Sequence, residues 1–536
     1  MPHLLKGRGP HEPEGGGVTF HHLLQLVVPA DAKAASRLKA VIKGLWFLAC
    51  ANALVLFFVQ GGYDIEVGPV HLHASSLRNW LALCLALSLS KAWLEERLGA
   101  RSVYEGLQSP WLLFIGTLTV YYANGHTFET GDTLPARVLP VSLLIDHDFY
   151  LDRWASTIEA YDDPYFARSL NGHLVSTYPP WGAVLSLPAY VIPVLKVGAR
   201  LSAEMLFDLE KRASMLTVAL SVFALFAGLR RVARPRVAWC IAVVYAFGTS
   251  SLSLISQAAW QHGPSQLFLS LTLYCLVRSR ETPIYVAWAG LALGWAVICR
   301  PVNLLMALPI ALYVLHKHRG QCIGFLLAGV PPLLLFLWYN DAYFGSPVQT
   351  GFGATVVTPA SLVGRHLSWF STPFFEGLVG VLFSPARGLF IYSPIFLCSL
   401  AGMVVAWREP GQVFLRYLSV APLLLVIPVA TLGSWWGGHG YGPRLLADSA
   451  PVLCYLMVPI FDRIGQRAWM KYMVVGLAGF SIGMHAIGFA YSGDWGSKVL
   501  DFDTHPERVW CWRESPPVLF GTQLLEQVWQ TVAMRF

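Results

Sequence analysis

Long apolar segments recur along most of the chain, and they restrict its fold more than any other feature. A membrane-spanning helix needs about 20 mostly apolar residues, or somewhat fewer when polar side chains at its ends reach the interface. This pattern predicts an all-α polytopic membrane protein with about 13 transmembrane helices. The predicted spans are 41–60, 79–93, 109–122, 214–229, 237–257, 264–279, 285–299, 301–316, 322–338, 391–407, 414–432, 447–461 and 472–491.

The composition excludes the soluble alternatives. Hydrophobic residues make up 55 % of the chain and charged residues 13 %, whereas an average soluble domain has about 25 % charged residues. The mean hydropathy is +0.52. A soluble enzyme of this size, a disordered protein and a nucleic-acid-binding protein all need far more polar surface. The lipid bilayer is therefore an expected partner of this chain, and nucleic acid is not.

The basic residues predict an orientation, because cytoplasmic loops of membrane proteins are enriched in Lys and Arg. With a cytoplasmic N-terminus, every loop that the thirteen spans place inside is basic, most clearly the cluster at 230–236. This agreement requires that residues 182–199, which contain two prolines and Lys196, lie at the outer interface as a helix instead of crossing.

The predicted organisation has three parts. Residues 1–40 form a cytoplasmic N-terminal segment, residues 41–491 a transmembrane domain, and residues 492–536 an outer tail. The domain has two long outer loops, 123–213 and 339–390, and the first holds eleven of the 31 acidic residues. A pure transporter usually shows short loops and internal repeats, which this sequence does not show.

The first outer loop carries the strongest local signal for chemistry. Asp132 follows a predicted span by about ten residues, and a carboxylate there can serve as a general base toward a hydroxyl group. Asp146 and Asp148 form an Asp-x-Asp pair that could share a divalent ion if the backbone is extended. The competing interpretation is that such acids, Asp152 included, are only solvated or paired with neighbouring arginines.

Other candidate residues lie at predicted outer ends of spans. An arginine offers a forked donor suited to phosphate, tryptophan faces suit sugar rings, and glycines let a ligand approach the backbone. Tight turns and a belt of interfacial aromatic residues are the structural alternatives. The candidates are Tyr178 in STYPPWG, His262 in WQHGP, Arg300 in CRPVN, and Trp436, His439 and Arg444 in WWGGHGYGPR.

Common sequence motifs for nucleotide binding and for a nucleophilic serine are missing from this chain. It has no Walker loop, dinucleotide fingerprint or nucleophile elbow. An enzyme acting at the outer face also has no nucleotide pool, so we expect a lipid-borne donor.

These motifs together resemble the GT-C superfamily of polyprenyl-phosphate-sugar glycosyltransferases, which includes the protein O-mannosyltransferases and the lipid A aminoarabinose transferases. The resemblance covers roughly residues 110–490 and is carried by GDTLPAR, STYPPWG, WQH, CRPVN, SPARGLFIYSP and WWGGHGYGPR. The motifs look most like those of uncharacterised bacterial members. The named families more often have Asp-Glu where this chain has Asp132-Thr133, which leaves the second acid unassigned among Asp146, Asp148 and Asp152.

The resemblance implies a GT-C fold with juxtamembrane helices on the outer loops, located in the bacterial inner membrane with a periplasmic active site. It implies inverting transfer of a hexosyl or pentosyl group from a polyprenyl phosphate to a hydroxyl of a lipid, glycan or protein. Asp132 would deprotonate the acceptor. Arg300 and Arg444, with His262 or His439, would neutralise the leaving phosphate. No cofactor is expected, and a divalent ion at Asp146 and Asp148 is the alternative.

Two other functions use similar ingredients. An O-antigen ligase or polymerase also acts on lipid-linked sugars, but it transfers a whole glycan from a diphosphate carrier. A transporter of lipid-linked glycans would need polar residues at mid-membrane depth, and the polar clusters of this sequence lie instead at predicted span ends.

The orientation is testable with an impermeant thiol reagent in intact spheroplasts. In a background without reactive native cysteines, cysteines introduced at Ser156 and Ser497 should be labelled, because both positions are predicted to face the periplasm. A cysteine at Pro235 should be protected, since that loop is predicted to be cytoplasmic. Labelling at Pro235 alone would reverse the arrangement.

Overall fold

The computed structural model describes residues 32–59, 63–67, 70–74, 76–97, 105–106, 108–161, 164–198, 200–351, 370–491 and 501–533. It is about 75 % helical. The first helices are α2 (Ala32–Phe58), α3 (Leu77–Arg97), α5 (Pro110–Ala123), α6 (Leu134–Ile145), α7 (Ala155–Glu159), α8 (Trp181–Val197), α9 (Ala203–Leu229), α10 (Pro235–Phe247), α11 (His262–Arg278) and α12 (Tyr285–Cys299). They are followed by α13 (Leu304–Lys317), α14 (Cys322–Phe344), α16 (Phe374–Phe383), α17 (Leu389–Tyr392), α18 (Leu397–Arg408), α19 (Val413–Thr431), α20 (Ala450–Asp462), α21 (Ala468–Ala490) and α22 (Pro516–Ala533).

The helices are those of a multi-pass membrane protein. Among the described residues, six helical segments are long and apolar enough to cross a bilayer, and several shorter apolar helices accompany them. The six are 36–58, 203–229, 319–344, 413–431, 444–462 and 468–490. Large apolar side chains of α14, such as Ile323 and Leu327, are exposed, as expected of a helix that faces lipid. The number thirteen remains a prediction.

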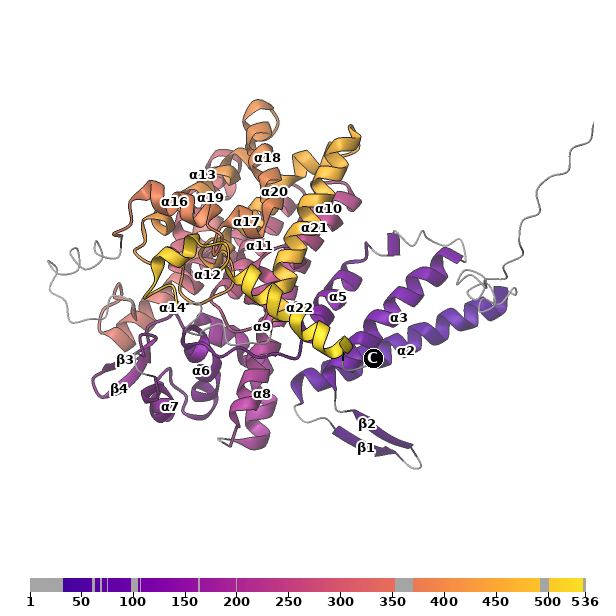
Figure 1. Ribbon diagram of the computed structural model, residues 1–536, viewed down its shortest axis with the longest axis horizontal. Coiled ribbons are helices and arrows are strands. Elements are labelled where there is room, and N and C mark those ends of the chain that lie inside the picture. Colours follow the sequence, from indigo (N-terminus) through magenta and orange to yellow (C-terminus); the bar gives the residue numbers. More distant parts are fainter. Residues whose placement is uncertain are drawn as a thin grey trace, which may run out of the picture.

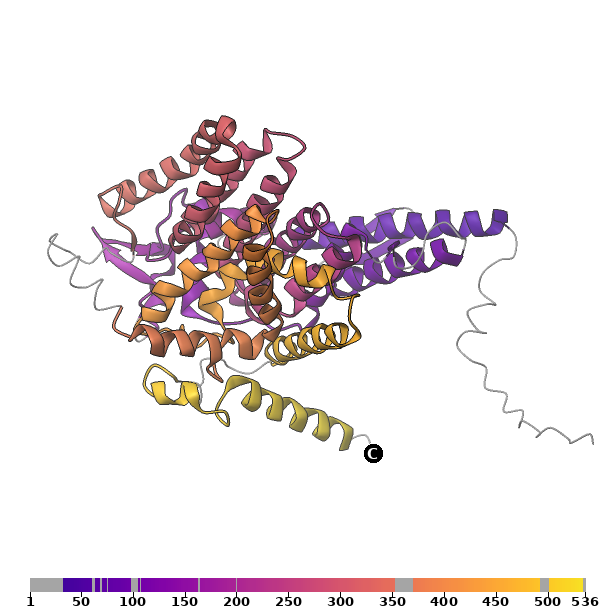
Figure 2. The ribbon, with the colours of Figure 1, turned by 90° about the horizontal axis from the view of Figure 1, so that it is seen from above.

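The helices form one large bundle with two appendages (Figure 1). Helices α2 and α3 pack side by side and extend away from the bundle, and α22 lies along its outside against α21 (Figure 2). Inside the bundle, α20 is buried along almost its whole length. The core therefore lies around α9, α10, α11 and α20.

Two helices have limits that differ from those of the predicted spans. Helix α9 begins at Ala203 instead of 214, because Ser202 caps its N-terminus by accepting a hydrogen bond from the Met205 amide at 3.2 Å. The predicted span 237–257 ends as an α-helix at Phe247, and a π-helical turn follows at Ser251–Ile255. Gly248 and the following hydroxyl residues favour this break, since serine and threonine side chains compete for backbone hydrogen bonds.

The predicted loop 123–213 is largely structured, and it modifies the all-α prediction. It contains α6, α7, α8, the start of α9 and a hairpin of strands β3 (Ala167–Leu170) and β4 (His173–Ser176). Asn171 and Gly172 close this hairpin with positive φ angles, as a two-residue Asn-Gly turn requires. A second hairpin joins β1 (Tyr63–Val67) to β2 (Val70–Ala74).

Ion pairs gather the basic helix ends at one face. Arg234, before α10, lies 3.2 Å from Asp462 at the end of α20, and Arg231, after α9, lies 3.7 Å from Glu281, after α11. Three of the segments predicted to be cytoplasmic, those after α9, α11 and α20, thus lie together. Ser156 and Pro235, two of the labelling positions, are exposed, whereas Ser497 lies outside the described residues.

At the opposite face, buried charged residues at the start of α9 hold neighbouring helices together. Arg137 of α6 donates to Glu210 at 2.6 Å, with only 5 % and 2 % of the two side chains exposed. Glu210 also accepts the Ala259 amide at 2.9 Å. Arg212 pairs with Asp208 at 2.6 Å and donates at 2.6 Å to the Leu56 carbonyl near the end of α2. These contacts join α2, α6, α9 and the segment before α11.

Removing one partner of the buried pair should destabilise the fold strongly. Arg137→Met leaves Glu210 charged and without its guanidinium, which typically costs about 3–5 kcal/mol. Thermal unfolding in detergent measures the loss. Arg153→Met is the matched control, because Arg153 and Asp146 form a pair that is about one-third exposed and such pairs contribute about 1 kcal/mol or less. Equal destabilisation by the two variants would contradict a structural role for the buried pair.

Candidate functional site

Asp132 lies in a short 3₁₀ turn, η1 (Gly131–Thr133), that leads into α6. Thr130 caps the turn by accepting the Asp132 amide at 3.3 Å. Gly131 is required there, because a Cβ atom would lie 2.7 Å from the Phe166 ring. The turn therefore fixes the backbone that carries the carboxylate.

The Asp132 carboxylate is held by two predicted site residues. One oxygen accepts a hydrogen bond from the Tyr178 hydroxyl, and the other is bonded to the Arg444 guanidinium. The side chains of Asp132 and Arg444 are 18 % and 13 % exposed, so the pair is mostly shielded from water. The structure thus brings together Asp132, Tyr178 and Arg444 from three distant parts of the chain.

The glycine-rich segment before Arg444 fixes its direction. Gly442 has a φ of +74°, and a Cβ atom there would lie 3.0 Å from Tyr392, so both conformation and space require glycine. The Arg444 guanidinium lies 4.6 Å from the centre of the Trp260 ring, a distance typical of cation–π contacts. Trp260 therefore helps to position the arginine, one of whose terminal nitrogens, Nη1, contacts Asp132.

The electrostatics of this cluster keep Asp132 ionised. Burial raises the pKa of Asp132, but Arg444 and the hydroxyls of Tyr178 and Tyr165 lower it more, and the result lies below the usual value. Burial and the adjacent carboxylate raise the pKa of Tyr178. A hydrogen-bonding phenol and an ionised carboxylate therefore face each other at neutral pH.

A second ion pair adjoins the first. Asp448 is fully buried and lies 3.0 Å from His262 and 2.6 Å from Arg300. Arg444 and Asp448 belong to the same 3₁₀ segment, η8 (Arg444–Ser449). His262 and Arg300 thus occupy the predicted region, but an acid that the sequence analysis did not single out holds them. An aspartate inside an apolar segment is the signal that could have found it.

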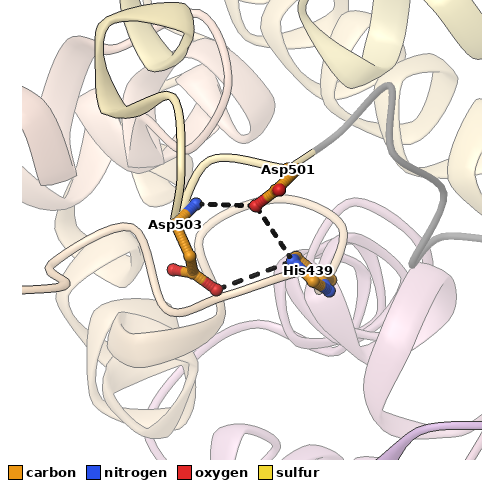
Figure 3. A group of neighbouring side chains, drawn as sticks. All are labelled: His439, Asp501 and Asp503. Carbon is orange, nitrogen blue, oxygen red and sulfur yellow. Dashed lines mark hydrogen bonds and ion pairs between the residues drawn. The ribbon is translucent and has the colours of Figure 1, made fainter. Parts of the chain in front are cut away.

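Trp436 and His439 take partners from the C-terminal segment instead. Trp436 donates to Asp503 at 2.8 Å, and the His439 Nε2 lies 3.6 Å from Asp503 and 4.0 Å from Asp501 (Figure 3). Within the described ranges, this trio is the group of His, Cys, Asp and Glu side chains that could offer three ligand atoms to a metal ion. All three side chains are at least 30 % exposed.

Arg387 connects this region to the bundle, and the sequence analysis did not single it out. It is buried and donates to the carbonyls of Trp436 at 2.9 Å and Gly438 at 2.7 Å. Its guanidinium also lies 4.8 Å from the Phe502 ring centre. Burial lowers the pKa of Arg387 to about 10. An arginine between apolar residues in SPARGLFIYSP was the available signal.

The three secondary acids bind their own surroundings. Asp146 pairs with Arg153 at 2.8 Å, and Asp148 accepts the Tyr150 amide at 2.9 Å. Asp152 accepts the Leu174 amide at 2.6 Å and lies 2.6 Å from His173. In the part of the chain that the structure describes, no third His, Cys, Asp or Glu joins the Asp146–Asp148 pair.

No family model matches the chain, and no curated protein sequence matches it. The geometry of the Asp132–Arg444 pair is therefore the basis for assigning a function.

The low pKa of Asp132 leads to a prediction about pH. A carboxylate whose folded pKa lies below its unfolded pKa adds stability at neutral pH and loses it as the pH falls through the folded value. Arg444→Gln removes the main cause of that depression, so burial should raise the Asp132 pKa above the usual value. The variant should then be destabilised most at pH 7.5 and less at pH 5, where Asp132 takes up a proton.

Melting temperatures of wild type and variant between pH 5 and 7.5 measure this difference. The double variant Asp132→Asn/Arg444→Gln is the control and should lack the pH-dependent part. A constant difference between wild type and Arg444→Gln across that range would show that Arg444 does not control the Asp132 pKa.

Proposed function

We propose that the protein is a membrane glycosyltransferase that moves a sugar from a polyprenyl-phosphate donor to a hydroxyl of a lipid, glycan or protein. The observation that carries the proposal is the contact between the Asp132 carboxylate and the Arg444 guanidinium. It places a candidate general base beside a candidate phosphate ligand, as transfer from a phosphorylated donor requires.

The Asp132–Arg444 contact suggests how donor binding would make the Asp132 carboxylate a stronger base. The donor phosphate carries a negative charge and competes with Asp132 for the Arg444 donors. As Arg444 turns to the phosphate, Asp132 loses the interaction that lowers its pKa most, and burial then raises that pKa. A carboxylate with a higher pKa is a stronger base. Tyr178 keeps the carboxylate in position during this exchange.

The transfer step balances without a cofactor. The acceptor hydroxyl gives its proton to Asp132, and its oxygen forms a bond to the anomeric carbon. The bond from that carbon to the phosphate oxygen breaks, and its electron pair leaves with the polyprenyl phosphate. Arg444 and Arg300 offset the charge that develops on the leaving group. A single displacement of this kind inverts the anomeric carbon.

The proposed setting follows from the charge distribution. The basic helix ends lie at one face. Asp132 and Arg444 lie near the opposite end of the bundle, since Arg444 precedes α20 and the basic face includes the other end of that helix. By the positive-inside rule, the basic face is cytoplasmic and the site lies at the outer face. The resemblance to bacterial GT-C enzymes adds the inner membrane of a bacterium, with the site in the periplasm. A polyprenyl tail would then lie in the outer leaflet.

A buried histidine favours a second candidate, transport of a lipid-linked glycan. His485, in one of the six long apolar helices, lies 2.8 Å from the Ser253 hydroxyl and 2.9 Å from that of Ser393. Ionisable residues inside membrane segments often mark a transport path.

A ligase or polymerase that uses a diphosphate carrier would employ the same Asp132–Arg444 pair.

The decisive experiment replaces Asp132 with Asn and measures turnover with a panel of polyprenyl-phosphate sugars in proteoliposomes. Because a positioned base contributes about 10²–10⁴ in rate, turnover should fall by that range. Asp148→Asn and Asp152→Asn are matched controls from the same loop and should stay within a few-fold of wild type.

Other results would redirect the proposal. Loss in Asp148→Asn or Asp152→Asn, with normal turnover in Asp132→Asn, would move the base along the loop. Transfer only from diphosphate-linked glycans would favour the ligase. Glycan movement without transfer, abolished in His485→Asn, would favour the transporter.

A further inference from the structure

A described cavity lies among the basic helix ends, and its lining shares no residue with the Asp132 cluster. Its volume is about 1090 Å³. It lies between the α2–α3 pair, the start of α5 and the ends of α9 and α20. We propose that this cavity binds an anionic phospholipid, with the headgroup phosphate among the arginines and an acyl chain along α2 and α5.

The charges of the cavity favour an anion. Its lining includes Lys91, Arg230, Arg234 and Arg236, against the two acids Glu95 and Glu105. Two of these charges already have partners outside the lining. Arg234 lies 3.2 Å from Asp462, and Glu95 lies 3.6 Å from Lys39. The lining as a whole carries four cations and two carboxylates, and basic pockets between membrane helices on the cytoplasmic side typically bind anionic lipid headgroups.

The cavity is amphiphilic along its length. Arg230 follows α9 and Arg236 stands at the start of α10, so the basic end coincides with a layer of helix ends. Trp46 lies in the middle of α2 and donates to Ser88 of α3 at 2.8 Å, so the other end reaches along the interior of that helix pair. Trp46 of α2 and Trp111 and Leu112 of α5 add apolar surface to this basic lining, and the combination matches a headgroup with its chain.

The shape of the cavity favours a phospholipid over a free anion. Trp111, at the start of α5, lines the cavity and is still 60 % exposed. The cavity therefore opens toward the apolar outer surface of the helices, where lipid chains lie. A soluble phosphate would gain nothing from this wall, whereas a phospholipid can enter sideways from the inner leaflet.

Native mass spectrometry of the full-length protein tests the proposal. The purified protein is incubated with an equimolar mixture of phosphatidylglycerol and phosphatidylcholine, and retained lipid is counted. Wild type should retain phosphatidylglycerol preferentially. The double variant Arg230→Gln/Arg236→Gln should lower that retention by about tenfold, since each basic side chain near a headgroup adds to the attraction.

Two further variants separate binding from folding and from general surface charge. Arg230→Lys/Arg236→Lys keeps the charge and should retain most of the phosphatidylglycerol. Arg408→Gln/Lys471→Gln removes two exposed cations that do not line the cavity and should leave retention unchanged.

Three results would overturn the assignment. The first is equal retention of the two lipids by wild type, and the second is an equal loss in the Arg408/Lys471 control. The third concerns the source of the phosphate. If inorganic phosphate displaces the bound lipid at low concentration, or if a polyprenyl monophosphate outcompetes phosphatidylglycerol, the site is not specific for a phospholipid.

Discussion

A guanidinium removed from water must meet a carboxylate or several carbonyl groups, and this constraint organises one whole face of the protein. Arg137 meets Glu210, Arg444 meets Asp132, and Arg300 meets Asp448. Each pair joins segments that are far apart in the chain. Because an unpaired buried charge costs several kcal/mol, on the order of 3–5, each pair also excludes alternative packings in which one partner would be left alone.

The same constraint gives the candidate site its chemistry. Burial on its own would raise the pKa of Asp132, and the contact with Arg444 reverses the effect. The carboxylate is therefore held ionised by an interaction that an incoming anion can weaken. If the acid were buried among apolar residues without an arginine, the binding of an anion could not change its pKa in this way. The need to pair buried charges thus fixes which helix ends lie together, and it makes the basicity of Asp132 depend on its contact with Arg444.

The sequence predicted the helices better than the contacts between them. Apolar segments locate helices directly, and the helix predicted at 285–299 has those limits in α12. The start of α9 escaped prediction because its first turns are charged, and these charges are buried by pairing instead of being solvated. The Asp132–Arg444 contact joins residues 312 positions apart, so no local pattern encodes it. Asp448 escaped because it lies inside an apolar segment and its partners come from elsewhere.

The short turn η8 carries one member of each of two ion pairs, Arg444 and Asp448. A 3₁₀ segment of six residues has little internal freedom, so a displacement of its first residue is passed on to its fifth. His262 and Arg300, which Asp448 holds, therefore depend on the same segment as the Asp132–Arg444 contact. The two ion pairs therefore share one backbone support, and a shift of η8 would change both contacts together.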